Sequence, residues 1–394
     1  MMKKVVLAYS GGLDTSVAIP WLKEQGYEVI AVAVDVGQPG DLQAAVERAT
    51  TLGAVESRLV DARSIYVERY ILPALRMNAL YQSRYPLISA LSRPLIAEVL
   101  TDVANETGAT AVAHGCTGKG NDQVRFEVAF SALAPDIEVL APVRDWGMSR
   151  EETIRYADER SLPIVTTKAS PYSIDENLWG RSIECGVLED PWAAPPSDVY
   201  ELTSSEPPSD PRDVEITFDA GVPVAVEGEI SSPINVIAAI GKIAGEYGYG
   251  RIDLVEDRLV GIKSREIYEA PAALALITAH KDLETLTLER SFAREKTRLE
   301  TKWAELVYEG LWFSPLREAI DAFAEKGDRG TTGDVRLRFT AGGCLPVGRR
   351  SPVSLYEHSM ATYDDDDAFD HSQAAGFVRL WGLPTTRWSK VQQK

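Results

Sequence analysis

The first part of this chain alternates between short apolar runs and longer amphipathic stretches, and this pattern limits the fold more than any other feature. Apolar runs that fit β-strands lie at residues 5–9, 29–36, 58–61, 111–114 and 138–142. Apolar positions at three- and four-residue spacing, typical of amphipathic helices, lie at residues 15–25, 41–52, 65–81, 94–106 and 150–159. Strands that alternate with helices in this way form parallel sheets. We therefore predict an α/β domain with a doubly wound parallel sheet, covered on both faces, that ends near Pro163.

The composition changes between residues 191 and 211, where six prolines fall within 21 residues. Proline interrupts both helices and inner strands, so we predict an exposed excursion there. Farther along, strand-like alternation occurs at residues 214–218, 222–230, 263–267, 335–339 and 352–355, and helical periodicity at 233–247 and 272–308. This second half is predicted to be α+β. The tail contains an acidic run at 364–367 and has little core of its own, so we predict three parts: 1–165, 166–362 and 363–394.

The charge balance narrows the choice of ligands. Lys and Arg number 41 against 59 Asp and Glu, which gives a net charge of −18 and argues against an open nucleic-acid surface. An anionic ligand must therefore meet main-chain N–H groups, a helix N-terminus or a few placed basic residues. Three widely separated cysteines, Cys116, Cys185 and Cys344, fit neither a disulfide framework nor a zinc site, so a reducing cytoplasm is expected. The apolar runs are too short for a signal peptide or a membrane span, and we expect neither.

A glycine loop follows the first predicted strand. Its nine residues are Ala8, Tyr9, Ser10, Gly11, Gly12, Leu13, Asp14, Thr15 and Ser16. Ligands of doubly wound sheets bind beyond the carboxyl ends of the strands, where a helix N-terminus offers N–H groups to an anion. The glycines let the backbone approach phosphate oxygens, and Asp14 fits such a site if Mg²⁺ lies between the carboxylate and the phosphates. The loop is neither a Walker A motif nor a dinucleotide fingerprint. An ordinary capped tight turn is the structural alternative.

A second segment rich in functional groups follows the predicted strand at 111–114. It reads His114, Gly115, Cys116, Thr117, Gly118, Lys119, Gly120, Asn121, Asp122, Gln123, Val124, Arg125 and Phe126. Because it follows a parallel strand, it is expected at the same sheet edge as the glycine loop. Donors and acceptors in this number suit small zwitterionic substrates, which carry a carboxylate and an ammonium group together. The alternative is a purely structural loop.

The glycine loop resembles the pyrophosphate loop of the N-type ATP pyrophosphatases, which cleave ATP between its α and β phosphates. Within that class, the chain resembles the argininosuccinate synthases over essentially its whole length. The matching motifs occupy residues 8–16, 85, 92–94, 114–126, 170–178, 182, 255–258, 263–265, 268–269, 305–308 and 354–356. The resemblance implies a nucleotide-binding domain of the adenine nucleotide alpha hydrolase type at 1–165. It also implies a synthetase and multimerisation domain at 166–362 and an oligomerisation tail at 363–394.

The same resemblance implies the substrate contacts. ATP contacts fall on Ala8, Tyr9, Ser10, Gly11, Gly12, Leu13, Asp14, Thr15, Ser16 and Gly115. Aspartate contacts fall on Thr117, Asn121 and Asp122. Citrulline contacts fall on Tyr85, Asn121, Arg125, Ser173, Ser182, Glu256 and Tyr268. The catalytic set is Asp14, Asp122 and Arg125, and no residue is assigned as a metal ligand.

Two positions depart from the family pattern. Ala90 stands where some members have a serine that contacts citrulline, and Val34 stands where some have an alanine beside the adenine. The assigned residues also have structural alternatives when they are taken singly. The tyrosines fit a core, Glu256 fits a charged turn, and the serines fit helix caps. His114 fits a buried residue with satisfied hydrogen bonds and is left out of the site.

The resemblance implies that citrulline and aspartate are joined to argininosuccinate while ATP is split to AMP and pyrophosphate, through a citrullyl-adenylate, in arginine biosynthesis and the urea cycle. ATP is a substrate and Mg²⁺ the expected cofactor. No nucleic-acid or membrane partner is expected. Family members are homotetramers, and the apolar residues of the tail, Phe369, Phe377, Leu380, Trp381, Leu383 and Trp388, are expected to pack on a neighbouring subunit.

Two other functions were weighed against this one. Another ATP pyrophosphatase would thiolate or amidate its substrate, but tRNA thiolation calls for a reactive cysteine pair and a basic face, which the sequence lacks. A nucleotide-binding regulator without catalysis would not need the substrate segments 114–126 and 255–268.

Overall fold

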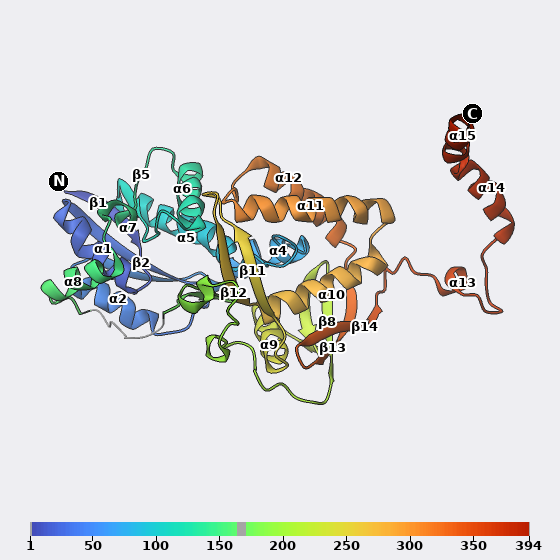
Figure 1. Cartoon of the computed structure of the whole chain (residues 1–394), viewed down its shortest axis with the longest axis horizontal. Helices are drawn as coiled ribbons and strands as arrows, with labels where there is room; N and C mark the ends of the chain where they lie inside the picture. The colour runs from blue at the N-terminus through green and yellow to red at the C-terminus, as the bar shows by residue number, and fades with distance from the viewer. Residues whose placement is uncertain (1, 164–170, 394) are drawn as a thin grey trace. The chain divides into compact units, whose positions relative to one another are not determined.

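A parallel sheet organises the N-terminal part of the fold. The computed structural model describes residues 2–163 and 171–393 (Figure 1). The sheet has the strand order β3-β2-β1-β4-β5, and all neighbouring strands are parallel. The strands are β1 (Lys3–Ala8), β2 (Tyr27–Asp35), β3 (Glu56–Asp61), β4 (Ala111–Ala113) and β5 (Glu138–Leu140). The predicted parallel α/β sheet is therefore confirmed. Its strand order reverses between β1 and β4, and ligands of doubly wound sheets bind beyond the carboxyl ends of the strands at such a reversal.

Helices connect and cover these strands. They are α1 (Leu13–Glu24), α2 (Leu42–Thr51), α3 (Arg63–Tyr66), the π-helical turn η1 (Val67–Ile71), α4 (Leu72–Arg76), α5 (Ile88–Thr107), α6 (Asn121–Leu133), α7 (Pro142–Trp146) and α8 (Arg150–Glu159). The single helix predicted at 65–81 is wrong, because η1 interrupts it and α4 ends at Arg76. The start predicted at Pro94 is also wrong. Helix α5 begins at Ile88 and keeps Pro94 inside it, where burial of residues 88–92 offsets the lost backbone hydrogen bond.

Residues 171–352 contain two antiparallel sheets. One has the order β11-β12-β7-β6 and the other β10-β9-β8-β13-β14. The strands are β6 (Ser173–Asn177), β7 (Gly180–Glu184), β8 (Arg212–Asp219), β9 (Val222–Val226), β10 (Glu229–Ile230), β11 (Arg251–Asp257), β12 (Lys263–Glu269), β13 (Gly333–Thr340) and β14 (Gly343–Arg350). The predicted strand at 352–355 is wrong, since β14 ends at Arg350 and those residues form a turn. Strands β6, β7, β11 and β14 were not predicted.

The helical elements of this second part are the 3₁₀ turns η2 (Gly186–Glu189) and η3 (Ser197–Val199), and the helices α9 (Pro233–Glu246), α10 (Pro271–Thr287), α11 (Arg290–Tyr308) and α12 (Pro315–Asp328). Of these helices, α9 and α10 pack on the antiparallel sheets, whereas α11 contacts α12 and α5, and α12 also contacts α4. The helical region predicted at 272–308 is two helices. Leu288 leaves the helical conformation, and the Glu289 carboxylate then caps α11 by accepting the N–H groups of Ser291 and Phe292. No helix in the described ranges has both the length and the apolar composition needed to cross a membrane.

The sequence predicted that the proline-rich connection at 191–211 is exposed, but the structure buries part of it. Val199 and Thr203 are buried within it. The fully buried Glu269 carboxylate accepts the N–H groups of residues 201, 202 and 203 at 2.8 to 2.9 Å, and the Thr203 hydroxyl at 2.6 Å. A carboxylate that accepts several hydrogen bonds can stay buried. The connection is therefore attached to the end of β12 and lies outside only in part.

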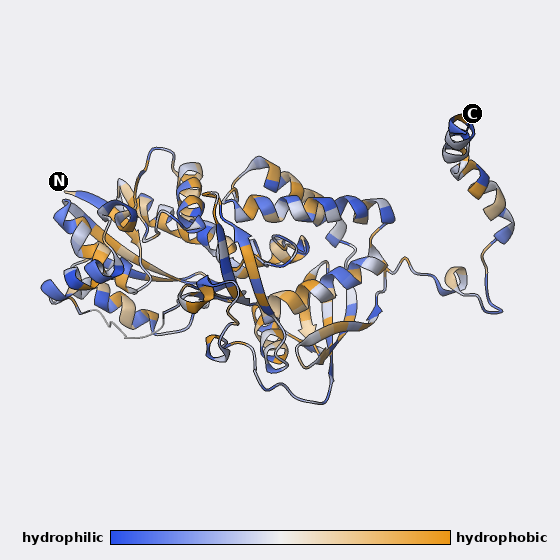
Figure 2. Cartoon of the chain, in the orientation of Figure 1, coloured by the Kyte–Doolittle hydropathy of each residue, from blue (hydrophilic) through white to orange (hydrophobic). Residues whose placement is uncertain are grey.

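Helix α5 connects the parallel sheet to the second part of the fold. It contacts β1, β2 and β4 of the first sheet and β6 and β7 of the antiparallel sheet beside it. One hydrophobic cluster runs through both parts, from Val6 in β1 to Phe339 in β13. Hydrophobic residues dominate strand β2, whereas α11 alternates between hydrophobic and hydrophilic residues (Figure 2). This agrees with a strand buried on both faces and a helix buried on one.

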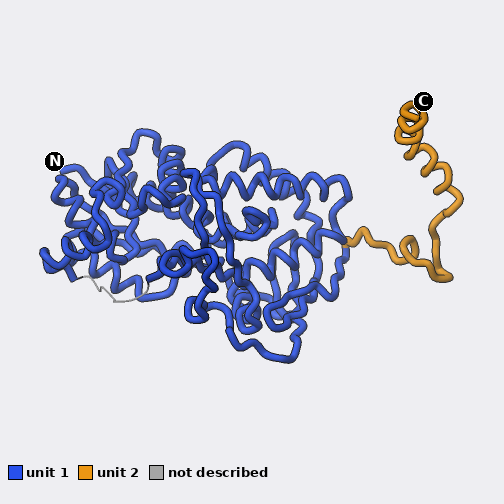
Figure 3. The backbone as a smooth tube through the Cα atoms, in the orientation of Figure 1, with its two compact units in different colours: residues 1–352 blue, residues 353–394 orange. Residues whose placement is uncertain are grey.

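The chain divides into two units, residues 1–352 and residues 353–394 (Figure 3). The second unit contains α13 (His358–Ala361), α14 (His371–Trp381) and α15 (Leu383–Gln392). Its described residues include none that is buried. The six apolar residues that the sequence analysis named in the tail are all exposed in this unit: Phe369, Phe377, Leu380, Trp381, Leu383 and Trp388.

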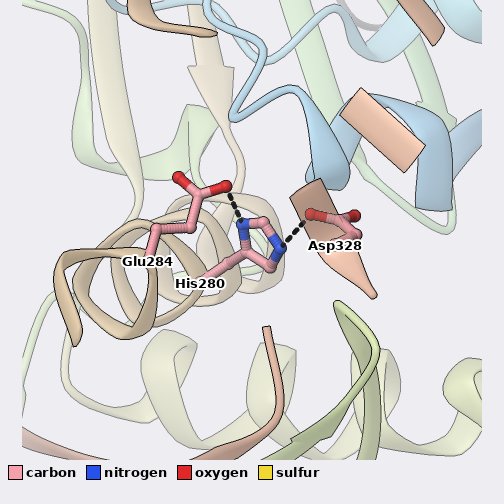
Figure 4. Close-up of side chains that lie close together, drawn as sticks. All are labelled: His280, Glu284 and Asp328. Atoms are coloured by element: carbon pink, nitrogen blue, oxygen red, sulfur yellow. Dashed lines mark ion pairs between the residues drawn. The ribbon is translucent and has the colours of Figure 1, made fainter. Parts of the chain in front are cut away.

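A buried ionic network fastens the end of α4 to α10, α11 and α12. Lys296 Nζ lies 2.8 Å from both Glu284 and Glu300, and Asn78 Nδ2 donates to the same two carboxylates at 2.7 and 2.8 Å. The ring of His280 lies between Glu284 and Asp328 (Figure 4). Removing one partner of a buried ion pair leaves an uncompensated charge and costs far more than removing an exposed one.

We expect Lys296→Met to lower the free energy of unfolding by about 3 to 5 kcal/mol, because two buried carboxylates would lose their cation. Urea denaturation followed by tryptophan fluorescence measures this change. Lys302→Met is the matched control, since Lys302 pairs with Glu305 on the exposed face of the same helix. That control should cost less than about 1 kcal/mol. Equal losses in both variants would contradict the network's role in stability.

Candidate active site

The glycine loop lies at the reversal point of the parallel sheet. Residues 9–12 leave β1 and lead directly into α1, whose N-cap Gly12 has no side-chain cap. Gly11 has φ +77°, and a Cβ there would lie 2.9 Å from Ala45 Cβ. This position therefore requires glycine for both its conformation and its space. The uncapped N–H groups at the start of α1 remain available for an anion.

Hydroxyl groups fix the shape of this loop. Ser10 Oγ lies 3.0 Å from Thr15 Oγ1, and Tyr9 Oη lies 3.3 Å from Ser16 Oγ. Arg48, from α2, donates to the Gly11 carbonyl at 3.4 Å and adds a positive charge to the loop. Asp14 is exposed on the first turn of α1. The structure therefore brings all nine predicted loop residues to one place.

The second segment lies beside this loop. Strands β1 and β4 pair in parallel with Leu7 opposite Ala113, so the residues after them leave the sheet at the same edge. A Cβ on Gly115 would lie 2.8 Å from Thr15 Cγ2, which explains the need for glycine at this approach. Thr117 is exposed on the same loop. His114 is fully buried, with Nδ1 accepting the Cys116 N–H and Nε2 facing Glu127.

The last six residues of the second segment, 121–126, form the start of α6 and carry the charged part of the site. Asp122 Oδ1 accepts from Arg125 at 2.8 Å, and its Oδ2 accepts from Arg93 at 2.8 Å. Burial alone would raise the pKa of Asp122, but the two guanidinium groups outweigh it and lower the pKa to about 2. Asp122 is therefore a carboxylate near neutral pH whose charge is already balanced inside the protein.

Arg93 is a site residue that the sequence did not assign. It lies on α5, and its Nη2 also pairs with Asp175 of β6 at 2.8 Å, so one guanidinium joins α6 to the β6–β7 hairpin. Both partners are far from Arg93 in the sequence. Arg93 could have been found through the Ser92-Arg93-Pro94 motif, which matches the family pattern but was given no role in the site.

A cluster of tyrosines surrounds Glu256 at the end of β11. The Tyr268 hydroxyl donates to Glu256, and the Tyr308 hydroxyl donates to its other oxygen at 2.7 Å. The Tyr85 ring stacks on Tyr268 with centroids 4.3 Å apart. Glu256 is only 1% exposed, and this burial, followed by the nearby Glu266 carboxylate, raises its pKa. Within the described ranges, no lysine or arginine lies within ion-pair distance of Glu256.

The structure also places Ser182 and Ser173, and the two positions that depart from the family pattern. Ser182 pairs with Tyr268 across the β7–β12 ladder, and its Oγ lies 3.5 Å from Ser89 Oγ. Ser173 begins β6, opposite Glu184, and is exposed. Ala90 is buried in α5 beside Ser89. Val34 is buried in β2.

Two sets of predicted residues thus come together. One is the pair of loops at the ends of β1 and β4. The other is a connected network around α6 and β11 that contains Tyr85, Asn121, Asp122, Arg125, Glu256 and Tyr268. The second segment of the sequence joins them, because its last six residues form the start of α6. Residues 164–170, which include Ser170 and the predicted boundary at 165, lie outside the described residues.

Two other features are separate from this site. A cavity of about 560 Å³ lies between the β6–β7 turn, residues 201–204 and α9, and none of the predicted substrate residues lines it. His280, Glu284 and Asp328 offer ligand atoms within 4.8 Å of one another, as a metal site would. However, the two carboxylates face opposite ring nitrogens, each at 3.6 Å, and Lys296 and Arg76 already pair with them. We assign this group to the structural network.

Comparison with known proteins agrees with this geometry. The family model of the arginosuccinate synthase N-terminal HUP domain matches residues 4–163, and that of the arginosuccinate synthase C-terminal domain matches residues 172–388. The chain is 55% identical over 394 residues to argininosuccinate synthase of Halalkalibacterium halodurans, covering 100% of this chain and 96% of that protein. It is likewise 55% identical over 394 residues to that of Bacillus pumilus, covering 100% and 98%.

A solved 4-thiouridine synthetase bound to RNA and ATP aligns with 40% of each chain, at 18% identity and a TM-score of 0.31, which is too slight a likeness to bear on function. The family models and the full-length relatives are decisive, since together they span both halves of the fold. This chain belongs to the argininosuccinate synthase family.

Proposed function

We propose that this protein joins L-citrulline to L-aspartate, forming argininosuccinate while ATP is split to AMP and pyrophosphate. The observation that carries the proposal is the continuity of the site. The loops at the ends of β1 and β4 lead into the first turn of α6, whose Asn121 connects through Tyr308 to Glu256. A loop with free helix N-terminal N–H groups thereby adjoins separate carboxylate, amide and guanidinium groups, which suits a triphosphate and two zwitterions.

In the first step, the ureido oxygen of citrulline attacks the α-phosphorus of ATP. An oxygen–phosphorus bond forms, the bond from the α-phosphorus to the bridging oxygen breaks, and pyrophosphate leaves. The N–H groups at the start of α1 are placed to stabilise the charge that develops on the pyrophosphate. The product is a citrullyl-adenylate, in which the ureido oxygen has become part of a good leaving group.

In the second step, the aspartate amine attacks the ureido carbon. A carbon–nitrogen bond forms, the carbon–oxygen bond breaks, AMP departs with the oxygen, and the proton of the amine passes to solvent. A carboxylate whose pKa lies near 2 is a poor general base, so we assign Asp122 to orienting the amine. Arg125 holds Asp122 in place at 2.8 Å. Most of the acceleration then comes from positioning, which can contribute several kcal/mol.

The expected Mg²⁺ fits the residues of the glycine loop. Asp14 offers an exposed carboxylate on the first turn of α1, and Ser10 and Thr15 offer hydroxyl oxygens beside it. Oxygen ligands of this kind suit Mg²⁺ that is shared with nucleotide phosphates. When bound, Mg²⁺ would offset the negative charge of the phosphates. We propose Asp14 as the residue that holds it.

The route of the ureido oxygen distinguishes this chemistry from other uses of ATP. With ¹⁸O in the ureido group of citrulline, we expect the label in AMP, because the oxygen leaves the carbon as part of AMP. Mass spectrometry of the nucleotide products measures it, with unlabelled citrulline as the control. Formation of ADP and phosphate, or AMP without the label, would overturn the proposed function.

Glu256 is proposed to hold the citrulline ammonium group, so its charge should set the affinity for citrulline. We expect Glu256→Gln to weaken citrulline binding about 10- to 150-fold, the worth of a charge-assisted hydrogen bond, with smaller effects on ATP and aspartate. The raised pKa of Glu256 adds a pH dependence. Its carboxylate becomes protonated as the pH falls through that pKa, so kcat/KM for citrulline should fall toward acid pH in the wild type.

Asp253→Asn is the matched control, since Asp253 is exposed on the same strand and pairs with Arg265. It should leave all three Michaelis constants unchanged. Steady-state assays with each substrate varied in turn give the comparison. Equal losses for citrulline, aspartate and ATP in Glu256→Gln would point to a structural role for Glu256 instead.

We further propose that the protein acts in arginine biosynthesis in the cytoplasm as a homotetramer in which the tail covers a neighbouring subunit. The exposed apolar residues of α14 and α15 support this assembly, because a closed symmetric oligomer would bury them. Trp381 is 72% exposed and Phe377 is 61% exposed in the single chain.

Truncation after Thr362 should therefore lower the oligomeric state, as measured by light scattering, because the apolar anchors are removed. Trp381→Ser in the full-length chain should weaken the assembly in the same direction without shortening the chain. The untruncated wild type is the reference at equal concentration. A tetramer that survives truncation would show that the tail is not part of the subunit contact.

A further inference from the structure

Tyr308 occupies the junction between the residues proposed for the two amino-acid substrates. It is the last residue of α11 and is 1% exposed. Its hydroxyl accepts from Asn121 Nδ2 at 2.8 Å and lies 2.7 Å from Glu256 Oε2. A phenol has one proton to donate, and an ionised carboxylate is the strongest acceptor within reach. The proton therefore points to Glu256, and a lone pair is left for Asn121.

The direction of the Tyr308 hydroxyl proton fixes the orientation of the Asn121 side-chain amide. Its Oδ1 accepts the main-chain N–H of Leu259 at 2.9 Å, from the turn between β11 and β12. If the amide were flipped, its NH₂ group would face the Leu259 N–H, and its oxygen would face a phenol whose proton is already used. Both contacts would become repulsive. Asn121 is thus held with its second amide hydrogen free to donate, which suits a substrate carboxylate.

The rest of Tyr308 holds other parts of the site. Its carbonyl accepts from Arg125 Nε at 3.1 Å, and the Arg125 guanidinium lies over its ring at 5.0 Å. The Tyr81 ring stacks on the Tyr308 ring, with the two centroids 3.5 Å apart and the two planes 5° apart. The ring and backbone therefore position Arg125, whereas the hydroxyl alone serves Asn121 and Glu256.

We propose that Tyr308 is a positioning residue whose hydroxyl orients Asn121 and Glu256 together, and so sets the binding of citrulline and aspartate through a single group. This inference rests on the proposed function for the names of the two substrates. The hydroxyl would not contact ATP, so its removal should separate the two amino acids from the nucleotide.

Tyr308→Phe tests the inference, because phenylalanine keeps the ring stack and the backbone contacts and removes only the hydroxyl. We expect KM for citrulline to rise about 10- to 100-fold and KM for aspartate about 5- to 10-fold, from the loss of one charge-assisted and one neutral hydrogen bond. KM for ATP should stay within about twofold. Tyr81→Phe is the comparison variant: it removes a phenol from the same stack whose hydroxyl interacts with the Asp257 carbonyl and with Tyr308, and among the described residues it makes no hydrogen bond to Asn121 or Glu256.

The pH profile provides a readout that a purely structural role would not change. Glu256 is faced by Tyr268 and Glu266 from β12, by Tyr308 from α11, by Arg125 from α6, and by Tyr81 and Tyr85 from the connection before α5. The Tyr308 hydroxyl stabilises the ionised form of Glu256, so its loss should raise the pKa of that carboxyl further. The acid limb of kcat/KM for citrulline should therefore move to higher pH in Tyr308→Phe and stay in place in Tyr81→Phe.

The outcomes separate this inference from the proposed function. Wild-type kinetics in Tyr308→Phe, equal changes in both variants, or equal losses for all three substrates would overturn the positioning role. If the wild type forms no AMP from citrulline and aspartate, the proposed function fails. Crystal structures of the two variants then decide the inference. A reoriented or multiply placed Asn121 side chain in Tyr308→Phe alone supports it, and an unchanged Asn121 in both variants overturns it.

Discussion

The balance of charge around Asp122 is the interaction on which the site depends. A carboxylate cannot be held in a confined place without compensation, and here Arg93 and Arg125 supply it from two directions at 2.8 Å. The position of Asp122 in the first turn of α6 adds the favourable end of the helix dipole. Because Arg93 also pairs with Asp175, the same charges hold α5, α6 and the β6–β7 hairpin at fixed separations. The residues proposed to bind the substrates on those elements are positioned as a consequence.

The chain also shows how an acidic protein can serve anionic ligands. Its net charge is −18, so the long-range field does not attract a triphosphate. The groups at the sheet edge, in contrast, can attract an anion at short range. Uncapped N–H groups begin α1, and Arg48 contacts the loop through the Gly11 carbonyl. Short-range N–H groups and Arg48 therefore supply the positive potential at the loop, beside the exposed Asp14 carboxylate.

The sequence predicted the parallel sheet and the edge at which the site lies, because burial on both faces leaves continuous apolar runs and because parallel strands all end at one edge. It did not predict α6, whose first turn is polar and follows three glycines, so no apolar stripe shows where the helix begins. It also gave no role to Arg93 or Tyr308. Their partners lie 29 to 187 positions away, and only the folded chain brings Arg93 to Asp122 and Tyr308 to Asn121. Contacts between residues so far apart leave no local sequence pattern from which they could be predicted.

The two carboxylates of the site, Asp122 and Glu256, differ in whether the protein already supplies them with a cation. This difference indicates which of them would bind the cation of a substrate. Asp122 already has two guanidinium partners, and its pKa is lowered to about 2. Among the residues that the structure describes, the hydrogen-bond donors to Glu256 are phenols, the Glu266 carboxylate is nearby, and the pKa of Glu256 is raised. A buried carboxylate in that situation gains most from a cation that enters from outside. An ammonium group bound at Glu256 would lower the cost of keeping it ionised, whereas one bound at Asp122 would compete with arginines already in place. The structure therefore favours Glu256 for affinity and Asp122 for orientation.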